Sequence, residues 1–133
     1  MSGLFYIGGG RTGLKAGDAT LADLWRFDPA ARQWALLEPK GRAPPPLSYH
    51  VMSPAAPFLY VFGGCTADHG RSNGLWRLDT RSDEWAELWA PGTVADDSES
   101  APCSRGGPSV AAGEGEVFVG FGQYSRTPRT ANE

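Results

Sequence analysis

Residues 24–34 read LWRFDPAARQW, and residues 75–85 read LWRLDTRSDEW. The two stretches lie 51 positions apart, and in each the second tryptophan follows the first by nine residues. An apolar segment that ends in glycines precedes each copy, at residues 4–9 (LFYIGG) and 59–64 (LYVFGG). A degenerate third copy of that segment is found at residues 117–122 (VFVGFG). Self-similarity with a period near fifty residues indicates a repeat protein.

Each copy predicts short β-strands joined by tight turns. Residues 59–62 are apolar at every position, which is typical of a strand buried between two neighbouring sheets. In residues 24–28 we expect Trp25 and Phe27 to share one face, because side chains alternate along a strand. Asp28 is expected to start a turn by bonding the backbone ahead of it, and paired glycines permit positive φ angles. The repeated residues are Gly8, Gly9, Trp25, Asp28 and Trp34, then Gly63, Gly64, Trp76, Asp79 and Trp85, and finally Gly122.

A four-stranded unit with a double glycine and two spaced tryptophans resembles the kelch repeat of β-propellers. The resemblance implies an all-β fold, a partial kelch β-propeller of about two and a half four-stranded antiparallel blades that is not closed. Trp34 and Trp85 are expected to cover their blade faces against adjacent blades. Because closed propellers have four to eight blades, we expect a fragment of a larger propeller. The predicted divisions are a kelch array over residues 1–122 with a partial blade at 3–38, a full blade at 47–89, an inter-blade loop at 90–104 and a partial blade at 105–122, followed by a non-repeat tail at 123–133.

Composition and charge argue against several classes of partner. The 133 residues carry a formal net charge of −3, and the 12 Lys and Arg are scattered singly, so we expect no nucleic-acid partner. No apolar run approaches the roughly 18 residues that span a bilayer, so we expect no membrane partner. Only two cysteines are present, Cys65 and Cys103, which fits a reducing compartment and predicts a cytoplasmic protein.

Within the kelch repeats, residues 104–109 (SRGGPS) and 115–122 (GEVFVGFG) look like the nitrile-specifier and epithiospecifier kelch proteins of the green lineage. In that family the propeller binds ferrous iron through a Glu, Asp and His set in a loop after the strand equivalent to residues 117–122, and it redirects glucosinolate breakdown towards nitriles. The matching loop here, residues 123–130, contains no carboxylate and no histidine. The resemblance therefore implies iron as a cofactor only if its ligands lie outside this chain.

Two other motifs match a nucleotide-binding loop and a metal site in part. Residues 8–13 match the glycine spacing of a dinucleotide fingerprint, but that fingerprint needs a helix opening at the loop, and the residues that follow run into a strand instead. Cys65, Asp68 and His69 bring a thiol, a carboxylate and an imidazole close together in the sequence. Zinc needs three or four ligands in fixed geometry, and nothing in this loop, which is flanked by glycines, fixes the three groups relative to one another. We interpret this segment as a solvated loop and His50 as a structural residue that bonds a neighbouring backbone.

The sequence holds no complete catalytic site. Ser48 and His50 share a strand face without a third group to orient the base, and Cys103 near Arg105 is the other nucleophile lead. We expect a protein-interaction scaffold that has no cofactor. It is expected to bind a protein partner through its rim loops, and it can associate through exposed blade faces. The alternatives are a fragment of a specifier-like propeller, a truncated product without activity and, for the arginines, ion pairs with acids on the next blade. The candidate rim residues, of types enriched where partners dock, are Arg11, Tyr49, Arg71, Arg105 and Tyr124.

Overall fold

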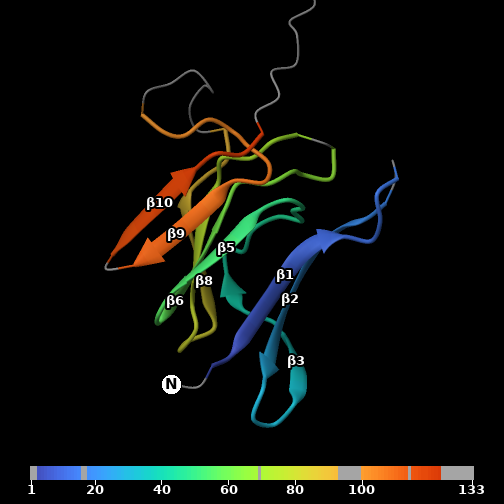
Figure 1. The fold of residues 1–133 in the computed structure, drawn as a ribbon, viewed down its shortest axis with the longest axis vertical. Helices are drawn as coiled ribbons and strands as arrows, with labels where there is room; N and C mark the ends of the chain where they lie inside the picture. The colour runs from blue at the N-terminus through green and yellow to red at the C-terminus, as the bar shows by residue number, and fades with distance from the viewer. Residues whose placement is uncertain (1–2, 16–17, 69, 93–99, 114, 124–133) are drawn as a thin grey trace, which may run out of the picture.

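The computed structural model describes residues 3–15, 18–68, 70–92, 100–113 and 115–123, and within them the chain forms strands, turns and loops without a helix. The strands group into a first sheet with the order β1-β2-β3, a middle sheet with the order β4-β8-β7-β6-β5, and a third sheet with the order β10-β9 (Figure 1). This confirms the all-β, unclosed fold that the sequence predicted. In the described ranges, nothing resembles a long apolar helix that could cross a membrane. The strand bounds are β1 (Phe5–Arg11), β2 (Thr20–Asp28), β3 (Gln33–Leu37), β4 (Lys40–Gly41), β5 (Val51–Ala55), β6 (Phe58–Phe62), β7 (Leu75–Asp79), β8 (Glu84–Trp89), β9 (Ser109–Gly113) and β10 (Glu116–Gly120).

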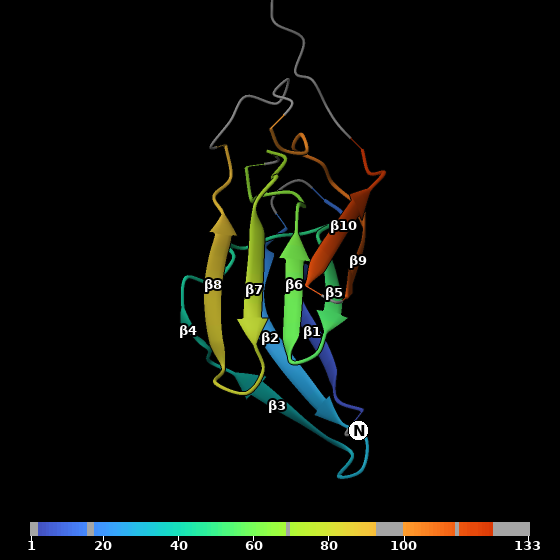
Figure 2. The ribbon, with the colours of Figure 1, turned by 90° about the vertical axis from the view of Figure 1, so that its left-hand side faces the viewer.

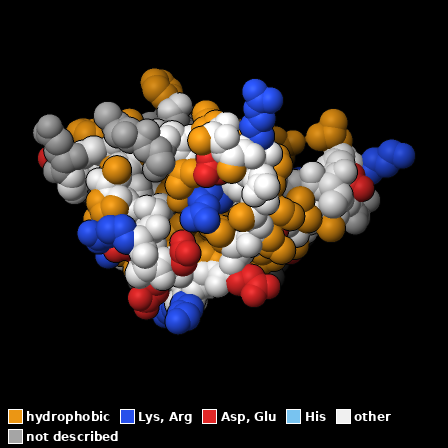
Figure 3. Space-filling view, turned by 90° about the horizontal axis from the view of Figure 1, so that it is seen from below, with side chains coloured by type: hydrophobic (Ala, Val, Ile, Leu, Met, Phe, Trp, Pro, Cys, Tyr) orange, Lys and Arg blue, Asp and Glu red, His pale blue; other side chains and the backbone are white. Residues whose placement is uncertain are grey.

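In the middle sheet, β5 to β8 form an antiparallel meander whose strands lie side by side in Figure 2. Residues 59–62 of β6 are all buried, as their uninterrupted apolar run predicted. The matching strand β1 differs, because Phe5 and Ile7 are 60% and 55% exposed. Among the described residues no further sheet covers that face of β1. Exposed hydrophobic side chains are visible between scattered charged groups when the molecule is viewed from below (Figure 3).

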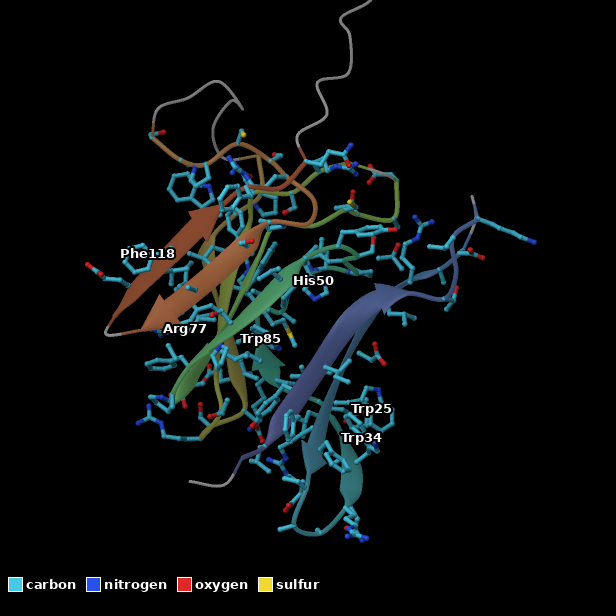
Figure 4. The ribbon with its side chains drawn as sticks, viewed as in Figure 1. Trp25, Trp34, His50, Arg77, Trp85 and Phe118 are labelled. Carbon is cyan, nitrogen blue, oxygen red and sulfur yellow. The ribbon has the colours of Figure 1, made fainter. Side chains whose placement is uncertain are left out.

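The main core lies between the first and middle sheets. Trp85 on β8 faces this core and is 6% exposed, as expected for a ring that covers a neighbouring sheet. Its repeat partner Trp34 on β3 is 51% exposed and packs on Phe27 with ring centroids 4.9 Å apart. Trp85 lies between the first and middle sheets, whereas Trp34 lies on the outer face of the first sheet (Figure 4), so the prediction that both rings pack against an adjacent blade holds only for Trp85 in the described residues. The buried core residues are Leu24, Leu47, Leu59, Val61, Trp76, Leu78 and Trp85.

The predicted aspartate turns are present after β2 and β7. The Asp28 carboxylate accepts a hydrogen bond from the amide of Ala30 over 2.8 Å. The Asp79 carboxylate accepts the equivalent bond from the amide of Arg81 over 2.9 Å, and it also accepts two bonds from the Arg81 guanidinium. The side-chain bonds with Arg81 are the main reason that the pKa of Asp79 lies well below its ordinary value. Both turns therefore follow from one local rule, that a short carboxylate side chain caps the backbone ahead of it.

The glycine pair of the first copy is displaced by one residue from the predicted one. The sequence predicted Gly8 and Gly9, whereas the positive φ angles occur at Gly9 (+61°) and Gly10 (+106°). In the second copy they occur at Gly63 (+71°) and Gly64 (+99°), as expected. In both copies, the amide of the second glycine donates a hydrogen bond to a carbonyl of the next loop over 2.8 Å. The run of three glycines concealed this register, because any adjacent two of them match the repeat.

Strand β4 was not predicted from the sequence, and it lies in the connection between the expected blades at residues 3–38 and 47–89. It pairs in parallel with β8 and so adds a strand at the outer edge of the middle sheet. Gly41 in β4 has a φ of +85°, and a Cβ there would overlap the carbonyl oxygen of Trp85. The chain therefore needs a glycine where it crosses from the first sheet onto the middle one.

Candidate functional site

Loops from all three sheets meet around a hollow of about 810 Å³. We call it the rim hollow, and it is lined by Arg11, Tyr49, Cys65, Arg71, Gly106, Gly107, Gly122 and Gln123. Arg11 ends β1 of the first sheet, Tyr49 precedes β5 of the middle sheet, and Arg71 lies in the loop between β6 and β7. The structure thus brings together three of the five rim residues that the sequence singled out.

Backbone hydrogen bonds between the loops hold the frame of the rim hollow. The amide of Cys65 donates to the carbonyl of Ser48 over 2.6 Å, which ties the end of the β6 segment to the loop before β5. The amide of Gly107, ahead of β9, donates to the carbonyl of Tyr49 over 2.6 Å. Because these bonds join segments far apart in sequence, the side chains around the hollow are positioned by the whole fold.

Arg11 and Arg71 bring positive charge to the wall of the rim hollow. The Arg71 Nη1 donates to Sγ of Cys65 over 2.9 Å, and the Arg11 Nη2 donates to the carbonyl of Lys15 over 3.2 Å. The Nε atom of each guanidinium is buried and has no hydrogen-bond partner within the described residues. The ion pairs found in the same residues lie elsewhere, between Arg42 and Glu87 and between Arg81 and Asp79. Buried donors without partners favour an acceptor supplied from outside.

Tyr49 combines exposure with an unusual backbone conformation. Its φ is +52°, which is uncommon for a residue other than glycine, asparagine or aspartate. Tyr49 is 56% exposed and lines the hollow, so its aromatic ring is accessible there. The Gly107 amide bound to the Tyr49 carbonyl helps to hold the backbone in this conformation. Strained positions of this kind cluster at ligand-binding sites.

Arg105 was predicted to belong to the rim, but it does not line the hollow. Its Nε and Nη2 donate to the carbonyl and Sγ of Cys103, each over 3.0 Å, and its Nη1 donates to the carbonyl of Phe121 over 2.9 Å. These bonds satisfy the guanidinium locally, so Arg105 clamps the segments before β9 and after β10. The acid on a neighbouring blade that the alternative interpretation required is absent from these partners. Tyr124, the fifth candidate, lies outside the described residues.

The structure also describes part of the predicted metal cluster and of the predicted Ser48 and His50 pair. Among the described residues, no group of three His, Cys, Asp or Glu side chains is arranged to hold a metal ion. His69, one member of the predicted thiol, carboxylate and imidazole cluster, lies outside those residues. The Cys65 thiol instead accepts the hydrogen bond from Arg71. The hydroxyl of Ser48 is buried and donates to the carbonyl of Cys65 over 3.4 Å.

Three residues of the rim hollow were not named as site residues from the sequence. Gly106 and Gly107 follow Arg105 directly, and their doubled glycine was the available signal for a close approach of two backbones. An added Cβ on Gly106 would come within 2.9 Å of Sγ of Cys65, so the group that comes close to Gly106 is a side chain and not a second backbone. Gln123 offered no signal, because it belongs to no repeated position.

Comparisons with known proteins agree with this architecture. Human host cell factor 2 (Homo sapiens) is 31% identical over 132 residues, an alignment that covers 90% of this chain and 15% of that relative. Kelch domain-containing protein 10 of Xenopus tropicalis is 33% identical over 79 residues, which covers 59% of this chain and 19% of that relative. The chain thus spans less than a fifth of the length of these curated relatives. The model of the KLHDC2/KLHL20/DRC7 Kelch-repeats domain matches residues 1–132, and the chain therefore belongs to the kelch-repeat family.

Proposed function

We propose that the chain is a protein-interaction module whose rim hollow binds a carboxylate-rich segment of a protein partner. The observation that carries this proposal is the pair of buried, unpartnered Nε atoms of Arg11 and Arg71 in the wall of one hollow. Guanidinium groups make their strongest hydrogen bonds with carboxylates and phosphates, because the planar fork of N–H donors matches two acceptor oxygens. A protein partner fits the kelch-repeat family, and arginine and tyrosine are enriched among the residues that contribute most to protein interfaces.

The size and surroundings of the hollow support a short peptide segment as the occupant. A volume of about 810 Å³ lies in the range of sites that enclose a drug-sized ligand. Tyr49 offers an aromatic ring beside the two cations, so an acidic residue with an apolar neighbour matches the site. The net charge of the chain is −3, and attraction for an acidic partner must therefore come from the local field of Arg11 and Arg71. Such local attraction weakens with salt.

A fluorescein-labelled hexaglutamate peptide is a direct probe of this proposal, with hexalysine as the opposite-charge probe. We expect hexaglutamate to bind the 133-residue chain and to lose about fivefold or more in affinity with Arg11→Gln or Arg71→Gln. The matched control is Arg32→Gln, which removes an exposed arginine that does not line the hollow. Equal affinity of the site variants and the control, with circular dichroism showing folded protein, would refute the proposal.

We also propose that the exposed face of the first sheet is covered by a further kelch repeat of a longer protein. Phe5, Ile7 and Trp34 are each more than half exposed, and the curated relatives are far longer than this chain. The isolated chain should therefore self-associate in light scattering, and Ile7→Lys or Trp34→Lys should reduce that association. Ala30→Lys, in the exposed turn after β2, is the control. A monomer at every concentration would contradict the proposal.

The specifier-like alternative stays a prediction. The relatives reported above are host cell factor 2 and kelch domain-containing protein 10, and neither name refers to glucosinolate breakdown. No observation on the described residues favours iron chemistry over the binding of a protein segment.

A further inference from the structure

A second cavity, of about 220 Å³, lies between the first sheet and the middle sheet and is separate from the rim hollow. Its walls are mostly apolar, with Leu24, Leu37, Leu47, Met52, Val61 and Trp85 among them. His50 lies at the same interface, between β1 and the start of β5, and Trp85 extends from the opposite side (Figure 4). An apolar cavity of about 150 Å³ is large enough for one benzene ring, so this cavity has room for a substituted ring.

His50 gives this apolar cavity one unsatisfied polar atom. Its Nδ1 is buried and has no hydrogen-bond partner in the part of the chain that the structure describes. The ring cannot move away easily, because it is packed between the glycines of two repeats. A Cβ added to Gly9 would lie 2.8 Å from Cε1 of His50, and one added to Gly64 would lie 2.8 Å from its Cβ. The structure therefore holds the imidazole in place beside an empty volume.

The chemistry of the imidazole defines the complementary group. Burial lowers the pKa of His50, and hydrogen bonds of the ring with the backbone of Gly8 and Leu47 act in the opposite direction, so the neutral ring is favoured at neutral pH. These bonds agree with the expectation that His50 bonds a neighbouring backbone, and they leave Nδ1 without a partner among the described residues. In a neutral imidazole one nitrogen donates and the other accepts. A hydroxyl group both donates and accepts, and it can therefore bond Nδ1 in either tautomer.

Charge at the edge of the cavity restricts the ligand further. Asp23 and Glu38 belong to its lining, and the Asp23 carboxylate accepts a hydrogen bond from Nε1 of Trp25 over 2.7 Å. Among the described residues, no lysine or arginine lines the cavity. An anionic ligand would lose its hydration here without gaining a cationic partner, so a neutral ligand is favoured.

From this geometry we infer that the cavity between the first and middle sheets binds a neutral aromatic ring that carries a hydroxyl group, with the hydroxyl bonded to Nδ1 of His50. The apolar walls enclose the ring, and His50 selects the hydroxyl. This site is independent of the proposed function, because none of Arg11, Tyr49 and Arg71 lines the cavity.

The test compares three single-ring probes by ¹H–¹⁵N NMR titration of the 133-residue chain. We expect p-cresol to bind about two- to tenfold more tightly than toluene, because only p-cresol satisfies Nδ1. Benzoate should bind more weakly than both. A tyrosine side chain presents the same ring and hydroxyl, so N-acetyltyrosine amide is titrated in parallel, and its binding would assign a peptide as the source of the ring. Equal binding of p-cresol and toluene, or binding of neither, would overturn the inference.

Two substitutions separate the cavity from the rest of the fold. Ala22→Trp fills the cavity from an exposed lining position and should abolish p-cresol binding, whereas Ala35→Trp, at an exposed position on β3 outside the lining, should leave it unchanged. His50→Phe should remove the preference for p-cresol over toluene while toluene still binds. If His50→Phe does not fold, the Ala22 and Ala35 variants still decide the question. Binding of hexaglutamate at the rim hollow should persist in the Ala22 variant.

Discussion

Gly41 lies against the backbone of Trp85 so closely that a Cβ on Gly41 would overlap the Trp85 carbonyl oxygen. Its φ of +85° adds a second reason why this position needs glycine. We expect Gly41→Ala to lower the free energy of unfolding by more than about 2 kcal/mol, because the left-handed conformation and the overlap both oppose the new side chain. Urea denaturation followed by circular dichroism measures the change.

The matched control for this substitution is Gly92→Ala. Gly92 also has a positive φ, of +69°, but a Cβ there would meet no heavy atom within 4 Å. Only the conformational cost applies, about 1–2 kcal/mol. If the two variants lost the same stability, the close approach of Gly41 to the Trp85 carbonyl would be contradicted.

Trp85 and Trp34 occupy the same position in the repeat and should respond differently to truncation. We expect Trp85→Ala to cost about 3–5 kcal/mol of unfolding free energy, because it leaves a void between the first and middle sheets. Trp34→Ala should cost about 1 kcal/mol, since the ring is half exposed and loses mainly its contact with Phe27. Urea titrations of the two variants give the comparison, and similar costs would show that Trp34 is buried in solution.

Stability should depend on pH through His50. Burial lowers its pKa in the folded chain below the ordinary value of 6.5, so the unfolded chain takes up a proton at a higher pH than the folded chain. The contribution of neutral His50 to the free energy of unfolding is complete above about pH 6.5 and is lost as the pH falls through the pKa of the folded chain. We expect the urea midpoint to decrease below about pH 6.5 and His50→Gln to flatten the decrease. An NMR titration of the His50 ring that gave an ordinary or raised pKa would contradict this.

The repeat predicted the fold because each of its signals is local. The unbroken apolar run of β6 predicts that the strand is buried. Asp28 and Asp79 predict turns because each carboxylate bonds the backbone just ahead of it. Strand β4 has no such local signal, because its two residues pair with residues of β8 that lie more than forty positions away in the sequence. The exposure of Trp34 could not be predicted from its own sequence, since it depends on what covers the face of the first sheet.

The sequence predicted the kinds of residue that form the candidate site, but it identified only some of the residues. Arg11, Tyr49 and Arg71 were recognised as docking residue types, but their convergence depends on loops that lie far apart in sequence. Arg105 has the same chemistry and was not distinguishable from them, because its bonds to Cys103 and Phe121 are tertiary. The pairing of His50 with a cavity was equally hidden, since the glycines that pack against it come from two different repeats.

Two of the backbone bonds at the rim, between Gly107 and Tyr49 and between Gly64 and Arg105, connect the middle and third sheets. Trp85 does not line the hollow and belongs instead to the interface between the first and middle sheets. Arg11 reaches the hollow from the first sheet, whereas Tyr49 and Arg71 reach it from the middle sheet. An interior substitution at that interface is therefore expected to change the spacing between Arg11 and Arg71 while both arginines stay the same.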